Sequence, residues 1–160
     1  MDFLKLNVDG AWKEEWQMAG IGGVFRDKKG KWKFGFAKKI EAISPEAAEL
    51  LAIREGLQIA WDCCYPKMEV ECDALGVVQL LAKPTEATNH PLGIVISDIN
   101  ILIARDWCVE FIHSRRESNM VAHGLAAVDQ KDTRVVYVRI PEHVREVYLR
   151  DLEYVPNSSN

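Results

Sequence analysis

The stretch Leu4-Lys5-Leu6-Asn7-Val8-Asp9-Gly10 decides how the rest of the chain is interpreted. Apolar and polar side chains alternate through it, which is the period of a strand with two unlike faces. The strand is predicted to end at Asp9, whose carboxylate would be held rigidly beside a tight turn and stay within reach of a ligand. Taken alone, Asp9-Gly10 is more simply interpreted as an ordinary turn, so its meaning depends on acidic residues further along the chain.

Length and composition favour one globular domain. The chain has 160 residues, of which 48% are hydrophobic and 28% are charged, values typical of a domain with a proper core. No apolar run is long enough to cross a membrane, and Met1-Asp2-Phe3-Leu4 lacks the layout of a secretory signal. We therefore expect an intracellular monomer without membrane contact. The net charge of −4 argues against a surface that coats nucleic acid throughout, but it does not exclude a local basic strip.

The cysteines point to no metal finger or redox motif. None of the four forms a Cys-x-x-Cys pair, which removes zinc-finger and thioredoxin-type interpretations. We expect reduced, partly buried thiols.

The first third of the chain predicts an antiparallel meander. A loop over Ala11–Met18 leads to a second strand at Gly20–Arg26, a hairpin turn at Asp27–Gly30 and a third strand at Trp32–Ile40. The glycines of the second strand are not a phosphate loop, because no Gly-Lys-Ser/Thr and no helix follow them. One face of the third strand is expected to carry Trp32, Phe34 and Phe36.

The remainder alternates between helices and strands. Ser44 as N-cap and Pro45 at the first helical position predict a long helix that ends near Cys63. The later elements are a strand at Met68–Cys72, a helix after Asp73, a helix at Leu92–Ala104, a strand at Trp107–His113, and a helix that the capping-box spacing of Ser114–Glu117 opens and that runs to about Gln130. Such alternation favours parallel additions through right-handed crossovers.

The predicted fold class is therefore α/β, with a mixed five-stranded sheet and helices on both faces. Three strands are antiparallel and two are parallel additions. We assign residues 1–130 to this domain and residues 131–155 to an extension packed on it, with an extended segment at Thr133–Ile140 and a short helix from Pro141 through Leu149. Residues 156–160 are expected to be disordered.

Three carboxylates could meet on this scaffold. If the first and fourth strands are parallel neighbours, Asp9 and Asp73 emerge at the same end of the sheet, and the first long helix could bring Glu49 down beside them. Buried carboxylates are costly unless they are paired or bound to a metal, and three together favour a hard divalent cation. Each has a simpler alternative, since Glu49 could be a charge on the helix surface and Asp73 could be only an N-cap.

Five spaced motifs together resemble type 1 ribonuclease H, and more closely its plant reverse-transcriptase-like branch. The resemblance covers about Leu4 to Val128, and the set of five motifs is specific because all of them occur in one order. The motifs are Asn7-Val8-Asp9-Gly10; Gly20-Ile21-Gly22-Gly23-Val24 with Arg26-Asp27 and Gly30; Ala48-Glu49-Leu50-Leu51-Ala52; Glu71-Cys72-Asp73-Ala74; and Arg116-Glu117-Ser118-Asn119 through Ala122-His123-Gly124-Leu125-Ala126.

The resemblance implies a metal-dependent endonuclease that cuts the RNA strand of an RNA–DNA hybrid and leaves 5′-phosphate and 3′-hydroxyl ends. Two Mg²⁺ or Mn²⁺ ions about 4 Å apart are expected with substrate. By the resemblance Asp9 bridges both ions, while Glu49 and Asp73 hold the ion at the leaving group.

The departure from the family pattern is His123, which stands where the family has a fourth acidic ligand. Imidazole suits softer ions than carboxylate does, so the resemblance implies a weakened or manganese-leaning site. His123 could instead act as a base or proton shuttle. The simpler alternative is a histidine on the helix surface with no catalytic part.

Substrate contacts are assigned to Gly10, Arg115, Arg116 and Asn119, and Asn119 is also expected to orient His123 from the same helix face. A further basic footprint for a phosphate backbone is predicted on the second and third strands, with a solvated hairpin as its alternative. Its residues are Arg26, Lys28, Lys29, Lys31, Lys33, Lys38 and Lys39. The loop from Lys83 to Pro91 is not basic, so a basic protrusion for holding hybrid is expected to be absent.

Two further functions compete with an active nuclease. The first is a catalytically weak or inactive nucleic-acid-binding or interaction module, and the second is an exonuclease or resolvase on the same scaffold. Fold alone does not separate them. The three mutually repelling carboxylates favour activity.

Overall fold

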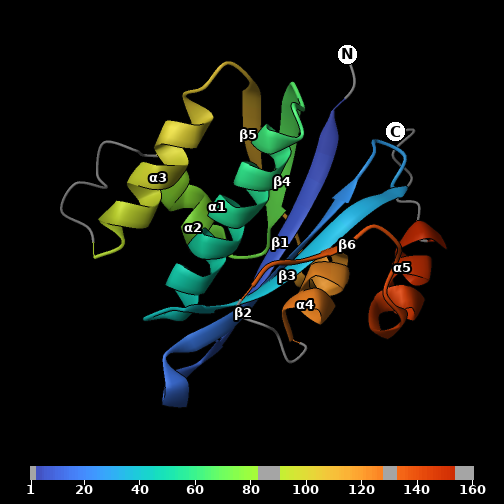
Figure 1. The fold of residues 1–160 in the computed structure, drawn as a ribbon, viewed down its shortest axis with the longest axis horizontal. Helices are drawn as coiled ribbons and strands as arrows, with labels where there is room; N and C mark the ends of the chain where they lie inside the picture. Colours follow the sequence, from blue (N-terminus) through green and yellow to red (C-terminus); the bar gives the residue numbers. More distant parts are fainter. Residues whose placement is uncertain (1–2, 83–90, 128–132, 154–160) are drawn as a thin grey trace.

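A six-stranded mixed sheet lies at the centre of the computed structural model, which describes residues 3–82, 91–127 and 133–153 (Figure 1). The order across the sheet is β5-β4-β1-β2-β3-β6. The strands are β1 (Leu4–Lys13), β2 (Met18–Arg26), β3 (Trp32–Glu41), β4 (Lys67–Cys72), β5 (Cys108–His113) and β6 (Val135–Tyr137). β1, β2 and β3 form the predicted antiparallel meander, and β4 and β5 are the predicted parallel additions.

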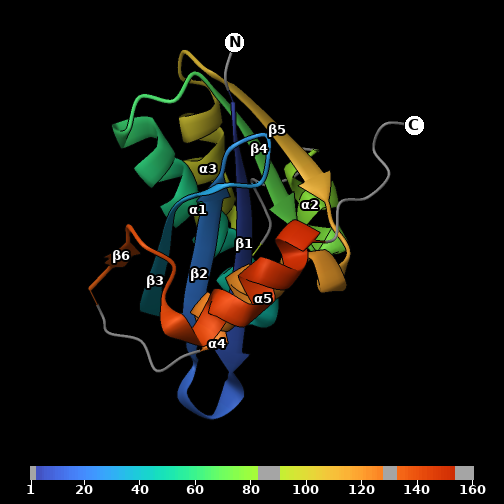
Figure 2. The ribbon, with the colours of Figure 1, turned by 90° about the vertical axis from the view of Figure 1, so that its right-hand side faces the viewer.

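Five helices cover the two faces of this sheet among the described residues. They are α1 (Pro45–Asp62), α2 (Leu75–Leu81), α3 (Gly93–Ile103), α4 (Met120–Ala127) and α5 (Glu142–Glu153), with short 3₁₀ turns η1 (Glu14–Trp16) and η3 (Arg116–Asn119). α1 and α3 lie on one face, and α4 lies on the other with α5 packed outside it (Figures 1 and 2). The prediction of an α/β fold with helices on both faces is confirmed. Each described helix is too short or too polar to cross a lipid bilayer.

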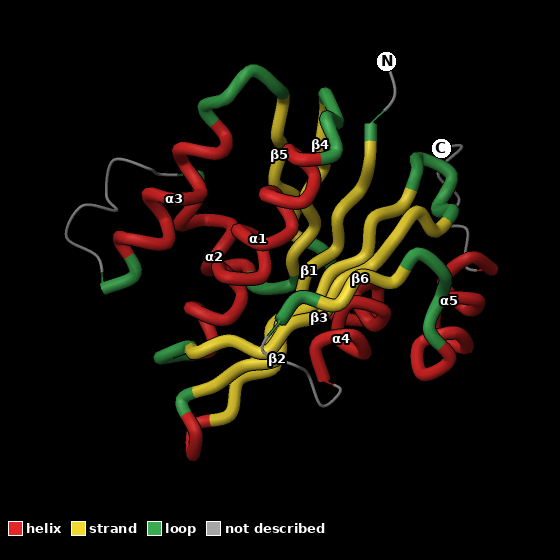
Figure 3. The backbone as a smooth tube through the Cα atoms, in the orientation of Figure 1, coloured by secondary structure: helices red, strands yellow, loops and turns green. Residues whose placement is uncertain are grey.

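The predicted count of five strands is wrong by one. β6 adds to the outer edge of the sheet, where Val135–Tyr137 pairs antiparallel with Gly35–Ala37 of β3 (Figure 3). The predicted loop over Ala11–Met18 is too long, because β1 and β2 stay paired as far as Lys13 and Met18 and only residues 14–17 connect them. The sheet therefore extends well past Asp9, and the carboxylate lies within β1 instead of at its end.

Two apolar clusters fill the space on either side of the sheet. The larger one joins Leu6 and Val8 of β1 to α1 and α3, and the smaller one joins β2 and β3 to α4 and α5. Trp32 belongs to the smaller cluster and Phe36 to the larger, so the prediction that they share a face is wrong. The reason is a bulge: Phe25 pairs with Phe34 but Arg26 pairs with Trp32, and the extra residue turns Trp32 to the other face.

Local signals located the turns and the first helix correctly. Ser44 Oγ accepts a hydrogen bond from Ala47 N at 3.1 Å, as expected of an N-cap before Pro45. The hairpin turn forms where predicted, with Gly30 at φ 87° and Asp27 Oδ1 accepting from Lys29 N and Lys31 N. No disulfide forms; Cys72 is buried, but Cys63, Cys64 and Cys108 are exposed instead of partly buried.

The predicted capping box at Ser114 is wrong. After Arg115 the chain first forms the 3₁₀ turn η3, which has no side-chain cap, and the α-helix begins only at Met120. Ser114 Oγ is buried and has no hydrogen-bond partner among the described residues. The predicted end of this helix near Gln130 and the predicted disorder of residues 156–160 lie outside the described residues.

Residues 133–153 pack against the sheet and α4. Tyr148 of α5 joins this segment to the β2–β3 hairpin, since its hydroxyl accepts from Trp32 N at 2.7 Å and donates to Gly30 O at 3.0 Å. Arg26 pairs with Asp151 at 3.4 Å, and Val144 fills the space that a side chain at Gly124 would need. α5 therefore supports α4 from its outer side.

We expect Tyr148→Phe to destabilise the fold. The substitution leaves the buried N–H of Trp32 without its acceptor, a loss of about 1–3 kcal/mol, which corresponds to a melting temperature lower by roughly 3–10 °C. Thermal unfolding followed by circular dichroism measures it. Tyr65→Phe is the matched control, because the Tyr65 hydroxyl makes no hydrogen bond in the described part of the chain. Equal melting temperatures for the two variants would contradict the role given to Tyr148.

Candidate active site

Parallel pairing of β1 with β4 sets the positions of two carboxylates. The register matches Val8 with Cys72 at the last pair between β1 and β4, so Asp9 and Asp73 come next, side by side, where this pairing ends. Asp73 lies in a bend before α2 and is not its N-cap, because Ala74 occupies that position without a side-chain bond. The simpler alternative for Asp73 is therefore wrong.

Glu49 comes down from α1 to the same place. It is 8% exposed, and its Oε1 accepts a hydrogen bond from Gly10 N at 3.1 Å. The close approach depends on Gly10, because a Cβ there would lie 2.8 Å from the backbone and Cβ of Ala48. Glu49 is thus not a surface charge, and Gly10 serves as both donor and spacer between β1 and α1.

Burial and the charge of Asp9 raise the pKa of the two neighbouring carboxylates, Glu49 and Asp73. Burial, followed by a hydrogen bond with Asp9 and the charge of Asp9, raises the pKa of Glu49 to about 9. Burial and the charge of Asp9 also raise the pKa of Asp73, although Arg116 and His123 act in the opposite direction. The three groups therefore share one electrostatic environment that disfavours their full ionisation.

His123 reaches this cluster from α4. Its Nδ1 lies 2.8 Å from Oδ2 of Asp9, which is itself only 5% exposed. α4 can lie this close to the sheet because β2 offers Gly22, where a Cβ would be 2.7 Å from Ala126 N. This contact excludes the alternative in which His123 lies on the helix surface away from the acidic cluster.

Asn119 does not have the place that the sequence suggested. It belongs to η3, is 1% exposed, and donates from Nδ2 to Val8 O at 2.7 Å. A side chain so buried has no surface for substrate, so that assignment is wrong. Its bond instead ties η3 to β1 one residue before Asp9.

The two predicted arginines differ in their position. Arg116 lines the cavity together with the carboxylates, whereas Arg115 is exposed and does not line it. Arg116 is thus the cation best placed to meet an anionic ligand.

Two residues of the predicted basic footprint on β2 and β3 are engaged in ion pairs within the molecule. Arg26 is buried against Asp151, and Lys38 pairs with Glu55 at 3.5 Å. Lys28 and Lys29 lie in the hairpin turn that follows Arg26. Arg26 pairs with Lys5 near the start of β1, whereas Asp9 lies further along that strand, so the turn is away from the carboxylates. The solvated-hairpin alternative fits these lysines better.

Most of the predicted site residues line one cavity of about 470 Å³. Asp9, Glu49, Asp73 and His123 line it, and Trp12 adds an aromatic wall that sequence reasoning missed. Sequence reasoning also missed Cys72, whose thiol donates to Glu49 Oε2 at 3.5 Å. The alternation Met68, Val70, Cys72 could have indicated its inward orientation.

The potential ligand atoms of Glu49, Cys72 and Asp73 lie within 4.8 Å of one another. Burial raises the pKa of the Cys72 thiol far above its usual range, so this sulfur stays protonated and is a poor ligand. The useful donors of the cluster are its carboxylate oxygens, which suit hard divalent cations.

Comparison with known proteins identifies the family. The family described as reverse transcriptase-like matches residues 7–128. The chain belongs to this reverse transcriptase-like family. The match includes Asp9, Glu49, Asp73 and His123, so the resemblance inferred from the spaced motifs is confirmed.

One relative of this reverse transcriptase-like chain is an Arabidopsis thaliana protein provisionally named as a ribonuclease H. The two are 36% identical over 124 residues, which make up 78% of this chain and 20% of the relative. The chain thus spans about a fifth of the length of the curated relative that it matches.

Solved structures confirm the ribonuclease H-like fold of the reverse transcriptase-like chain. The N-terminal RNase H domain of a Mycobacterium tuberculosis protein has a TM-score of 0.70 at 19% identity and covers 79% of this chain and 91% of its own. RNase H1 of Halobacterium salinarum has a TM-score of 0.67 at 23% identity, covering 78% and 94%. LC11-RNase H1, solved with an RNA/DNA hybrid, has a TM-score of 0.69 at 21% identity, covering 77% and 93%.

Proposed function

We propose that this chain is a metal-dependent endonuclease that hydrolyses the RNA strand of RNA–DNA hybrids and leaves 5′-phosphate and 3′-hydroxyl ends. The observation that carries the proposal is the convergence of Asp9, Glu49 and Asp73 from β1, α1 and the end of β4 in one cavity. The name of the Arabidopsis relative and the hybrid bound to LC11-RNase H1 support this substrate.

The residues present fit divalent cations. Asp9 and Glu49 are buried, and burial together with the neighbouring charge of Asp9 raises the pKa of Glu49, an environment that a bound cation would relieve. Asp9, Glu49 and Asp73 would hold Mg²⁺ or Mn²⁺, two ions being expected once substrate is present. When bound, the ions would supply charge stabilisation at phosphorus and acidify water.

The chain's own groups have distinct tasks in this proposal. Arg116 at the cavity wall would attract a phosphate oxygen of the substrate. If Nδ1 of His123 donates to Asp9, its Nε2 carries a lone pair that can accept a proton from an attacking water. The Gly10 N–H holds Glu49 in place through its bond to Oε1.

A second candidate is a catalytically weak or inactive hybrid-binding module. The observation in its favour is His123, which stands in the place of a family carboxylate and occupies Oδ2 of Asp9. An oxygen engaged in this way is less available to a cation.

The deciding experiment is cleavage of an end-labelled RNA–DNA hybrid with Mg²⁺, Mn²⁺ or a chelator. We expect metal-dependent cutting of the RNA strand alone, with products that a kinase cannot phosphorylate at the new 5′ end until a phosphatase has acted. All-RNA and all-DNA duplexes of the same sequence are the controls. Binding of hybrid without cutting in either ion would place the second candidate ahead.

Metal-free protein should lose stability as pH rises. The pKa of Glu49 rises from about 4.5 to about 9 on folding, so the folded protein keeps a proton that the unfolded chain releases. The associated stability is complete below about pH 4.5 and is lost toward pH 9. We expect the melting temperature in chelator to fall by roughly 5 °C or more between pH 5 and 9.

Glu49→Gln should remove most of that pH dependence, since an amide does not titrate. Glu46→Gln is the matched control, because Glu46 is an exposed residue of the same helix and lines the same cavity. Mg²⁺ at pH 9 should raise the melting temperature of the native chain and leave that of Glu49→Gln closer to its metal-free value. Parallel pH profiles for native chain and Glu49→Gln would contradict the proposed electrostatics.

A further inference from the structure

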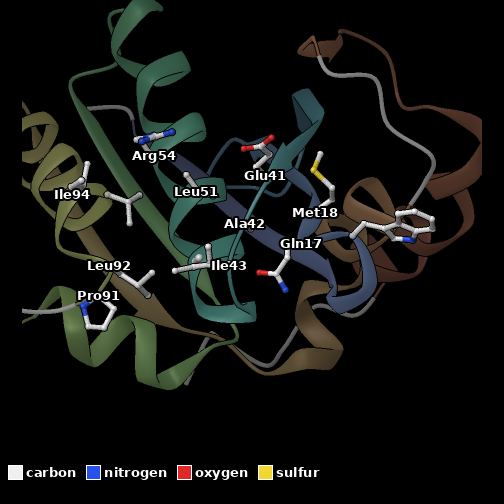
Figure 4. A pocket seen from close by; sticks show the side chains of 13 residues that line it. Gln17, Met18, Glu41, Ala42, Ile43, Leu51, Arg54, Pro91, Leu92 and Ile94 are labelled. Atoms are coloured by element: carbon white, nitrogen blue, oxygen red, sulfur yellow. The ribbon is translucent and has the colours of Figure 1, made fainter.

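A second and larger cavity lies apart from the carboxylates. It has a volume of about 560 Å³ and forms a groove between the β1–β2 connection, the end of β3, and helices α1 and α3. Figure 4 shows Pro91, Leu92 and Ile94 on one side of this groove, with Gln17, Met18 and Glu41 across from them. It shares no lining residue with the catalytic cavity.

Strongly exposed apolar side chains of the described residues gather at the groove. Five large apolar residues are at least 60% exposed, and three of them line the groove: Trp16 at 71%, Ile43 at 63% and Ile94 at 83%. Single exposed apolar residues are ordinary, but a cluster around a cavity marks an interaction site. Leu51 adds a half-buried apolar residue to the lining.

The backbone of Ala42, which lines the groove, is already hydrogen-bonded. Ala42 N donates to Gln17 O at 3.0 Å, and Ala42 O accepts from Trp12 Nε1 at 2.8 Å. The exposed apolar side chains around it are therefore the main features that a partner can recognise. A helix satisfies its own backbone and presents an apolar stripe, so it suits such a groove better than an extended peptide does.

The charges of the groove are uneven. Arg54 is neutralised by Asp98 at 2.9 Å, whereas Glu41 has no ion-pair partner in the described part of the chain. Glu14 and Glu15 of η1 add two exposed carboxylates next to Trp16, so that three carboxylates face the exposed cations Lys13 and Lys39. This end is net acidic, which disfavours a phosphate backbone and favours a partner with Lys or Arg at one end.

We infer that the groove lined by Trp16, Ile43 and Ile94 is a docking site for an amphipathic helix of another protein, with an apolar face and basic residues at the end that lies over Glu41. The site is separate from hybrid cleavage. Its occupation leaves the carboxylate cavity open, so the two activities can be tested independently.

The test uses a displayed library of short helical peptides with varied apolar faces and varied end charges. We expect selected peptides to share an apolar i, i+3, i+7 stripe and basic residues at one end. Ile94→Ser and Trp16→Ser should each weaken their binding about tenfold or more, consistent with loss of an interface anchor. Glu41→Lys should reduce it several-fold, and more at low salt than at high salt.

The matched control is Ile101→Ser. Ile101 is also on α3 and 60% exposed, but it does not line the groove, so its substitution should leave binding unchanged. Because all these side chains are exposed, the variants should fold, which their circular dichroism and melting temperature verify.

Three results would overturn the inference. They are no enrichment of basic-ended apolar helices, binding that Ile94→Ser and Ile101→Ser change equally, and competition between selected peptides and an RNA–DNA hybrid. The last result would assign the groove to nucleic acid. Hybrid cleavage by Ile94→Ser is measured alongside, and a rate equal to that of the native chain is expected whether or not the helix binds.

Discussion

Asp9→Asn is expected to abolish metal-dependent cleavage, with a loss of about a thousandfold or more. Asp9 lies between Glu49 and His123, since its charge raises the pKa of Glu49 and its Oδ2 lies 2.8 Å from His123 Nδ1. Asparagine keeps the size but removes the charge and one acceptor oxygen. A thousandfold loss corresponds to about 4 kcal/mol of transition-state stabilisation.

Single-turnover cleavage of a labelled hybrid at saturating enzyme measures this loss without interference from binding. Asp106→Asn is the matched control, because Asp106 is exposed in the turn before β5, and its rate should stay within about threefold of the native rate. The melting temperature of Asp9→Asn in chelator should not fall, since removing one of three repelling charges relieves Glu49. A folded Asp9→Asn variant with nearly native activity would refute the assigned site.

His123→Asp is expected to raise magnesium-supported cleavage by about tenfold and to bring the Mg²⁺ and Mn²⁺ rates closer together. The imidazole now lies against Asp9 and offers nitrogen, which suits softer ions than Mg²⁺. A carboxylate on the same turn of α4 would offer oxygen. Rates measured over a range of each metal concentration separate metal affinity from turnover.

The control for this substitution is His123→Asn, which removes the imidazole without adding charge. It should not gain activity with Mg²⁺. A fall in activity for both variants would mean that the imidazole has its own task, such as proton transfer at Nε2, and would exclude the view of His123 as a weakened metal ligand.

Much of the fold follows from local patterns. The alternation through Leu4–Asp9 predicts β1, and Ser44-Pro45 predicts the start of α1 to the residue. The same patterns bring Asp9 and Asp73 side by side once parallel pairing is assumed, and the register confirms that pairing, although β1 continues past Asp9. These features depend on nearby residues, because side-chain period and helix caps act within a few positions.

Other features depend on partners far away in the chain. The burial of Asn119 is decided by Val8, 111 positions earlier, and the pairing of Arg26 by Asp151, 125 positions later. No local pattern distinguishes these side chains from exposed ones that contact substrate. The bulge that turns Trp32 to the opposite face also arises only when β3 pairs with β2.

Local patterns along the chain are enough to predict the meander, the helix–strand alternation and the order in which the acidic residues occur. Tertiary packing alone brings Trp12 into the lining of the acidic cavity and the Cys72 thiol against Glu49, sets the hairpin lysines away from that cavity, and forms a second, apolar groove. The difference lies in the distance along the chain between the interacting residues, because helix caps and strand periods are properties of a few neighbouring residues. Burial, cavities and pKa shifts arise from segments that meet only when the whole chain has packed.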